Sequence, residues 1–214
     1  MTPTPTAIRE YDRTAPDADE TETATFALGC FWGPDAEFGA LDGVVRTRVG
    51  YAGGTTADPS YHALGDHTEA FQVDYVPAEI SFADLLNVVF ESHHPHRQTG
   101  KVQYQNIVFT GTPEQRETLE TFLADRDLAT DAIETRIERL GEFHLAEDYH
   151  QKHSLRATRR VLSAFEEAGY DDADMRESPA SAKLNAVAAG HDVTSIPELG
   201  IGEDPLARDS YPTR

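Results

Sequence analysis

Short apolar runs, separated by Gly, Pro and polar turns, dominate residues 23 to 190. Alternation with a period of two is typical of strands, whereas apolar residues three or four apart indicate a helix. The pattern predicts five strands, at about 23–29, 44–51, 68–75, 103–110 and 132–140. It predicts helices that begin near residues 34, 81, 112, 147 and 178.

Capping signals support several of these helix boundaries. Ser81 opens its helix like a capping box, and Thr112 precedes a proline at the favoured first helical position. A long helix over about 147–168 is expected to end at Gly169, a good C-cap residue.

The order of the central elements is β-α-β-β-α-β, a split βαβ arrangement. This order predicts the α+β class, with an antiparallel-rich sheet and helices on one face. We expect a two-layer, ferredoxin-like sheet with a helical extension toward the C-terminus.

The N-terminal end of the chain carries almost no large apolar groups. Residues 1–22 are rich in Thr, Pro and acidic residues, which predicts a disordered acidic tail. We expect one catalytic domain over 23–190 and a C-terminal tail over 191–214.

Acidic residues outnumber basic ones by 38 to 18, which gives a formal net charge of −20. Such a surface repels nucleic acid and anionic membranes, so we expect neither as a partner. The acidic residues are spread along the chain, which favours a salt-rich cytoplasm where screening tolerates self-repulsion. An ordinary acidic protein is the alternative.

No apolar run approaches the roughly 20 residues of a membrane span. The N-terminal residues lack the basic and apolar regions of a signal peptide, and a single cysteine excludes an internal disulfide framework. We therefore expect a cytoplasmic protein, which we take to be a monomer.

The only cysteine and the only tryptophan lie side by side in Gly29-Cys30-Phe31-Trp32-Gly33-Pro34. An apolar run leads into this segment, and Pro34 favours the first turn of a helix. Cys30 therefore precedes a helix start, where free N–H groups and the helix dipole stabilise a thiolate. We interpret Cys30 as a reactive thiol, and the alternative is a buried, inert cysteine.

The motif Gly29-Cys30-Phe31-Trp32-Gly33 resembles the active-site signature of peptide methionine sulfoxide reductase, type A, which acts on the S epimer. Three further segments resemble the family in the same order: 50–54, 65–69 and 146–151. The resemblance covers about residues 24 to 155 well and 156 to 192 more weakly. It implies the same type of fold.

Sulfoxide reduction needs a soft nucleophile, an acid for the departing oxygen and a pocket for the methyl group. Cys30 supplies the nucleophile. Glu69 is the candidate acid, because a partly buried carboxyl at a strand start stays protonated nearer neutral pH. Without the resemblance, Glu69 would be one solvated carboxylate among 38 acidic residues.

Aromatic residues are the candidate walls of the substrate pocket. Phe31 and Trp32 are adjacent, so at least one is expected to face the site, although core packing is the commonest use of aromatics. The resemblance implies that both surround the methyl group. It also implies that Tyr61 and Tyr104 donate hydrogen bonds to the sulfoxide oxygen, whereas each alone would be an ordinary half-buried tyrosine.

The resemblance is incomplete in the loop before Tyr104. Most relatives carry an Asp five residues before that tyrosine, where this chain has Thr99, and Ser92-His93-His94-Pro95 replaces Asn-His-Asp-Pro. These departures weaken the expected acid-assisting network. Arg97 or Lys101 is an alternative stabiliser of the Cys30 thiolate or of a developing oxyanion.

His93, His94 and His96 also raise the possibility of a metal site. This loop offers no cysteine and its spacing matches no zinc-finger pattern, so the ligand set is incomplete and we predict no metal.

The leading hypothesis is an enzyme that reduces methionine sulfoxide in oxidised proteins or as the free amino acid. The alternatives are a thiol-based redox sensor or peroxidase that uses Cys30, and a non-catalytic relative that binds oxidised methionine. Without a second cysteine, a sulfenic acid on Cys30 must meet an external thiol. We expect no bound cofactor, and a thioredoxin, a glutaredoxin or a low-molecular-weight thiol as the reductant.

Overall fold

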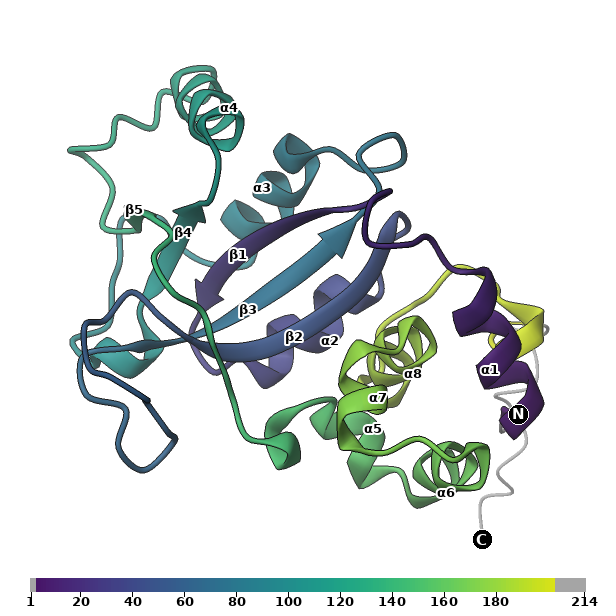
Figure 1. Ribbon diagram of the computed structural model, residues 1–214. Helices are drawn as coiled ribbons and strands as arrows, with labels where there is room; N and C mark the ends of the chain where they lie inside the picture. The colour runs from purple at the N-terminus through teal and green to yellow at the C-terminus, as the bar shows by residue number, and fades with distance from the viewer. Residues whose placement is uncertain (1–2, 203–214) are drawn as a thin grey trace, which may run out of the picture.

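A single six-stranded sheet forms the centre of the protein in the computed structural model, which describes residues 3–202 (Figure 1). Its strand order is β5-β4-β1-β3-β2-β6. The strands are β1 (Glu22–Leu28), β2 (Val44–Ala52), β3 (Thr68–Tyr75), β4 (Asn106–Thr110), β5 (Arg136–Arg139) and β6 (His144–Leu145).

Five of these strands were predicted from the alternating pattern. β1 pairs antiparallel with β3 on one side and with β4 on the other, and β2 pairs antiparallel with β3. β4 and β5 run parallel. The expected strand over 132–140 is shorter, and the two-residue strand β6 was not predicted, because its pairing with β2 is set by tertiary contacts.

Helices α2 (Trp32–Gly39), α3 (Phe82–Glu91) and α4 (Pro113–Ala124) begin where the capping signals place them, within two residues. Phe38 of α2 and Phe82 of α3 both pack on Phe26 of β1, with ring centroids 5.8 and 5.9 Å away. These two helices therefore cover the same face of the sheet, as Figure 1 shows. The α+β class is confirmed.

A second hydrophobic cluster lies beside the sheet and is built from helices (Figure 1). It contains α1 (Pro5–Thr14), α5 (His153–Ala157), α6 (Arg159–Ala168), α7 (Asp172–Glu177) and α8 (Pro179–Ala189). α8 lies so close to α2 that a Cβ on Gly39 would be 2.7 Å from the carbonyl oxygen of Ala182.

The expectation of a disordered tail over residues 1–22 is wrong for α1. Thr4 caps this helix, and Ile8 is fully buried in the helical cluster. The expected C-terminal tail also has structure up to residue 202, since Leu199 and Ile201 are buried in the same cluster. The remainder of that tail, 203–214, lies outside the described residues.

The predicted long helix over 147–168 is also wrong. The structure has a 3₁₀ turn at Asp148–His150, then α5, then α6. The helix is interrupted at Lys152, which adopts the left-handed conformation with φ 53°, and again at Thr158, where φ −98° and ψ 85° separate α5 from α6. The Lys152 side chain is pulled into the core by polar partners that local periodicity does not reveal.

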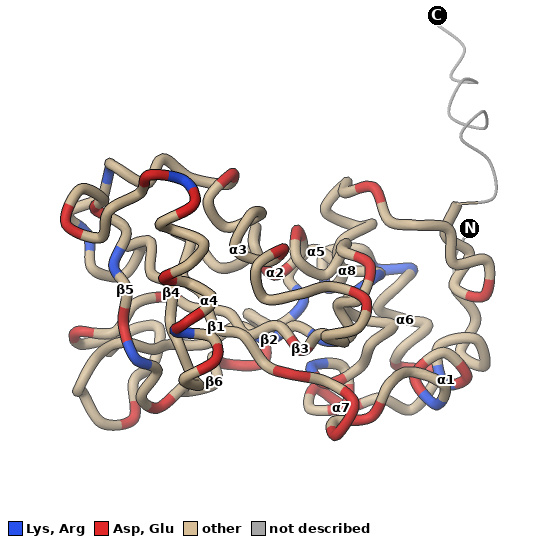
Figure 2. The backbone as a smooth tube through the Cα atoms, turned by 90° about the horizontal axis from the view of Figure 1, so that it is seen from above, with Lys and Arg blue, Asp and Glu red and all other residues tan. Residues whose placement is uncertain are grey.

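The charges are distributed over the whole surface. Figure 2 shows acidic residues on the sheet loops and on the helical cluster alike. Among residues 3–202, no helix combines the length and the apolar character that crossing a membrane requires.

Candidate active site

Cys30 lies in the short turn that joins the end of β1 to the start of α2. Gly29 makes the turn possible, because its φ of +71° is a conformation that residues with side chains rarely adopt. Cys30 is an exposed residue, and the backbone N–H of Trp32 acts to lower the pKa of its thiol. The predicted strand, turn and helix are therefore present, with the thiol at the helix start.

Glu69 is the second residue of β3, and it is 1% exposed. Its Oε2 accepts a 3.1 Å hydrogen bond from the backbone N–H of Phe31, and its Oε1 accepts one of 2.7 Å from Nε2 of Gln103. Because Phe31 directly follows Cys30, the bond from Phe31 places the Glu69 carboxyl beside the Cys30 turn, and each of the two groups shifts the pKa of the other. The candidate nucleophile and the candidate acid are thus direct neighbours.

Loss of hydration shifts the pKa of both groups upward, fully for the buried Glu69 and only in part for the exposed Cys30. It raises the pKa of Glu69 above its ordinary value, against the effects of Gln103, Phe31 and Cys30. It also raises the pKa of the Cys30 thiol, and the neighbouring Glu69 adds to this effect against the N–H of Trp32. The expected stabilisation of the thiolate by an N–H group of the helix start is present, but loss of hydration and Glu69 outweigh it in the pKa of Cys30.

Phe31 and Trp32 both pack around His150. The Phe31 ring is buried, 5.2 Å from His150 and 6.0 Å from Tyr51, whereas Trp32 is half-buried and 5.7 Å from His150. The Trp32 ring stacks on His153, with centroids 3.7 Å apart and planes at 5°. The two residues form one aromatic wall beside Cys30.

Tyr61 and Tyr104 approach each other from two loops, close enough for Tyr61 to raise the pKa of Tyr104. Burial raises the pKa of Tyr104, and Glu69, Tyr61 and Cys30 add to the shift. The structure therefore brings the six predicted residues together: Cys30, Phe31, Trp32, Tyr61, Glu69 and Tyr104.

The family model described as peptide methionine sulfoxide reductase matches residues 22–179, which include this whole constellation. The chain belongs to the peptide methionine sulfoxide reductase family. It is an oxidoreductase that acts on methionine sulfoxide, and the sensor and binding-protein alternatives are not favoured.

Curated relatives of the reductase come from distant organisms. Peptide methionine sulfoxide reductase A5 of Oryza sativa is 42% identical over 178 residues, which cover 79% of this chain and 68% of the rice protein. The Drosophila melanogaster reductase is 36% identical, with 78% and 68% covered. The enzyme MsrA of Haloquadratum walsbyi is 43% identical over 61% of this chain and 81% of its own.

Solved structures of reductases share the fold. Methionine sulfoxide reductase A of Corynebacterium diphtheriae has a TM-score of 0.56 and 32% identity, over 73% of this chain and 83% of its own. The reduced form of Mxr1 from Saccharomyces cerevisiae has a TM-score of 0.51 at 24% identity, over 72% and 91%, which is evidence for the fold alone.

Two residues of the reductase site were not singled out from the sequence. Gln103 donates to Glu69, and Glu147 accepts from the hydroxyl of Tyr51 at 2.7 Å and from the backbone N–H of Tyr61 at 3.0 Å. Glu147 therefore fixes the loop that carries Tyr61. The only signals were the position of Gln103 beside Tyr104 and that of Glu147 within a family-like segment.

The loop before Tyr104 does not supply a cation to the reductase nucleophile. Lys101 Nζ lies 5.8 Å from the centre of the Tyr104 ring, and neither Lys101 nor Arg97 is among the groups that shift the Cys30 pKa. Thr99, which stands at the position of the family Asp, accepts a hydrogen bond from the Lys101 backbone.

The three loop histidines use ring nitrogens in hydrogen bonds within the protein, and Nδ1 of His94 accepts from the backbone N–H of His96. Nδ1 of His93 bonds the Val89 carbonyl oxygen, and Nδ1 of His96 bonds that of Ala132. Within residues 3–202, no three His, Cys, Asp or Glu side chains are arranged to hold a metal ion.

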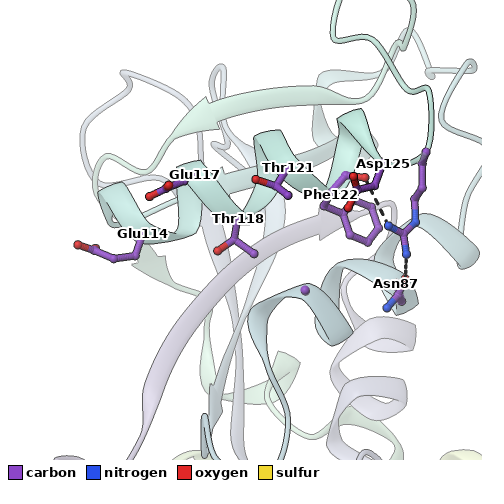
Figure 3. A pocket seen from close by; sticks show the side chains of 9 residues that line it. Asn87, Glu114, Glu117, Thr118, Thr121, Phe122 and Asp125 are labelled. Atoms are coloured by element: carbon purple, nitrogen blue, oxygen red, sulfur yellow. Dashed lines mark hydrogen bonds between the residues drawn. The ribbon is translucent and has the colours of Figure 1, made fainter.

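An open hollow of about 430 Å³ lies away from the reductase site, between α3 and α4 (Figure 3). Phe122 forms part of it, and the Arg126 guanidinium lies 3.7 Å from the centre of the Phe122 ring. Arg126 also donates to Oδ1 of Asn87. The six predicted site residues do not line this hollow.

Proposed function

We propose that this protein reduces the S epimer of methionine sulfoxide, in oxidised proteins and as the free amino acid, with Cys30 as nucleophile and Glu69 as acid. The observation that carries this assignment is the buried Glu69 carboxyl held next to the Cys30 turn by the 3.1 Å hydrogen bond from the backbone N–H of Phe31. The resemblance of the motif around Cys30 to the type A enzymes supports the choice of epimer.

The first half-reaction transfers the oxygen to the enzyme. Cys30 Sγ attacks the sulfoxide sulfur, and a proton from Glu69 passes to the sulfoxide oxygen. The S–O bond to methionine breaks as the oxygen moves to the cysteine sulfur, which leaves methionine and a sulfenic acid on Cys30. Because burial raises the pKa of Glu69, the proton is available nearer neutral pH than in an exposed carboxyl.

The remaining residues hold the substrate. Phe31 and Trp32 would enclose the methyl group, since they form the apolar wall next to the thiol. The hydroxyl groups of Tyr61 and Tyr104 would donate to the sulfoxide oxygen. Gln103 and Phe31 N–H keep the Glu69 carboxyl directed at Cys30.

The second half-reaction requires an external thiol and no bound cofactor, because Cys30 is the only cysteine of the chain. The incoming thiol attacks the sulfenic acid, water leaves and a mixed disulfide forms. A second thiol then attacks that disulfide and restores Cys30. A thioredoxin, a glutaredoxin or a low-molecular-weight thiol would serve.

One stoichiometric turnover tests this assignment. Without reductant, we expect one methionine per enzyme from the S epimer and none from the R epimer. Cys30 should then react with a dimedone-type reagent, and mass spectrometry should locate the adduct. An unmodified Cys30 after methionine release would show that the oxygen never passed through this sulfur.

We also infer that the central sheet is of the ferredoxin-like split βαβ type. The order β4-β1-β3-β2, antiparallel throughout, supports this inference, as does the packing of α2 and α3 on one face. The flanking strands β5 and β6 would then be additions to a four-strand core.

We infer further that the protein is a cytoplasmic monomer of a salt-rich cell and binds neither nucleic acid nor membranes. The net charge of −20, spread over the surface in Figure 2, supports this inference. A Debye length of about 3 Å at 1 M salt would screen the repulsion between these carboxylates. We expect the melting temperature to rise between low and molar potassium chloride, and an unchanged melt would contradict the inference.

A further inference from the structure

Residues 147–153, which we term the strap, pass from the sheet to α5 (Figure 1). Two histidines of the strap contact Trp32. His150 lies 5.7 Å from the Trp32 ring, and His153 stacks on it at 3.7 Å. The orientation of the indole therefore depends on where the strap lies relative to α2.

Lys152 lies between these two histidines and is completely buried. Its Nζ donates to Oδ1 of Asp35 at 3.0 Å, to the carbonyl oxygen of Thr47 at 2.5 Å and to the Thr47 hydroxyl at 2.9 Å. All three ammonium protons have acceptors. The ion pair thus fixes the strap to a strand of the sheet and to α2.

Asp35 is also fully buried, and both oxygens of its carboxylate accept hydrogen bonds. Oδ1 accepts from the Thr47 hydroxyl at 2.6 Å, and Oδ2 accepts from Nδ2 of Asn185 at 3.0 Å. Asp35 lies one helical turn after Trp32 in α2. A closed ring of contacts results, from Trp32 along α2 to Asp35, to Lys152, to His153 and back to the indole.

The backbone of Lys152 has the left-handed conformation, which costs a residue with a side chain free energy. This conformation turns the chain so that the Lys152 side chain enters the core while His153 faces Trp32. A buried ion pair is weak evidence for stability, because desolvation of both charges offsets their attraction. Fixing one register between strap and helix is a role that such a pair can fill.

We propose that the Asp35–Lys152 pair is a positioning device that sets the Trp32 wall, and thereby makes the pocket selective for a methyl substituent on the sulfoxide. The effect on selectivity rests on the proposed function, in which Trp32 encloses that group. A pocket discriminates one methylene by about 10- to 200-fold when its wall is held in place. If the Trp32 ring can move, the pocket also accepts an ethyl group on the sulfoxide sulfur.

The test compares methionine sulfoxide with ethionine sulfoxide, whose sulfur carries an ethyl group. The variant D35N/K152M removes both charges, and the new amide can accept from Asn185 and donate to Thr47. Neutral replacement of a buried pair commonly leaves a folded protein. The selectivity is the kcat/KM for methionine sulfoxide divided by the kcat/KM for ethionine sulfoxide. We expect this ratio to be at least about threefold lower in D35N/K152M than in the parent, a small part of the discrimination that a rigid pocket provides.

Trp32 is the only tryptophan, so intrinsic fluorescence reports its position without turnover. We expect acrylamide quenching of Trp32 to increase in D35N/K152M and its anisotropy to decay faster. Thr47→Val keeps the ion pair and removes one acceptor of Lys152. It should increase the quenching of Trp32 and speed its anisotropy decay, but less than D35N/K152M does. It serves as the second variant if the double variant does not fold.

A matched control removes another largely buried ion pair of the same protein. Arg48 and Asp74 are joined at 2.6 Å between β2 and β3, and the side-chain hydrogen bonds of both residues go to residues outside the strap. R48M/D74N is expected to melt at a lower temperature with an unchanged substrate ratio and unchanged Trp32 quenching.

An unchanged ratio and unchanged quenching in folded D35N/K152M would overturn the proposal, and so would equal changes in R48M/D74N. If the parent protein reduced neither sulfoxide, the proposed function would fail and selectivity with it. The quenching comparison would still decide whether the pair positions Trp32.

Discussion

The carboxylates of Asp66 and Glu69 are three residues apart, and the fold shifts their pKa values in opposite directions. Asp66 is exposed, and its oxygens accept from the backbone N–H and hydroxyl groups of Thr55 and Thr56, at 2.8 to 3.0 Å. These bonds hold its pKa far below the ordinary value, with the Thr55 N–H first among the causes. Glu69 also accepts hydrogen bonds, but burial outweighs them and raises its pKa.

The comparison shows that a count of donors does not determine the charge of a carboxylate. In the exposed loop, Asp66 stays ionised and its carboxylate holds the backbone of Thr55 and Thr56. At the buried start of β3, Glu69 can keep its proton and act as an acid. The reactive sulfur lies beside the second of these groups. If the two carboxylates differ in this way, Glu69 affects the chemical step and Asp66 affects only the position of the loop.

The largest effect is expected from Cys30→Ser, which removes the nucleophile that Glu69 would serve. Turnover of methionine sulfoxide should fall below detection, because a hydroxyl is a poor nucleophile toward sulfur and no other thiol exists. The melting temperature should stay close to that of the parent. Substantial residual turnover in this variant would mean that the site lies elsewhere.

Glu69→Gln should lower kcat/KM by roughly 10²-fold or more, the usual scale of general acid catalysis. Iodoacetamide should still alkylate Cys30, which separates loss of the acid from loss of the thiol. Parental turnover in the variant would remove Glu69 from the mechanism.

The pH dependence of the same variant sharpens the contrast. Parental kcat/KM should decline as pH rises through the raised pKa of Glu69, and this decline should be absent from the residual activity of Glu69→Gln. Because a carboxyl with a raised pKa loses stability as pH rises through that value, the variant should melt higher than the parent at neutral pH. A lower melting temperature would contradict the dominance of burial.

The smallest effect is expected from Asp66→Asn, which leaves one acceptor oxygen for four donors. The loop that carries Tyr61 would loosen, so KM should rise by roughly two- to fivefold, the scale of a few lost hydrogen bonds, with kcat nearly unchanged. Asp58→Asn, an exposed residue of the same loop, is the matched control and should change neither constant. A large fall in kcat for Asp66→Asn would erase the distinction between the two carboxylates.

The sequence determined much of the fold because local signals agreed with tertiary packing. β3 has the predicted bounds, and Ser81 forms the predicted capping box. The helix over Pro5–Thr14 escaped prediction because one fully buried side chain, Ile8, joins it to a distant cluster. Composition alone could not reveal that contact.

The site was predictable to the extent that it lies in continuous motifs. The residues around Cys30 and Glu69 carry the family resemblance, so their roles could be proposed in advance. The contacts of Gln103 and Glu147 join loops far apart in the chain, and no periodicity encodes them. The direction of the Cys30 pKa likewise depends on burial, which the local helix signal does not report.

The close packing of α8 on α2 shows how this reductase should not be shortened. The region that the family shares ends at residue 179, the first residue of α8, yet Asn185 reaches back from that helix to Asp35. A protein cut to residues 22–179 would uncover the apolar side of α2 and leave Phe165 without part of its cluster. The minimal folding unit is therefore larger than the shared region, and it includes helices from both ends of the chain.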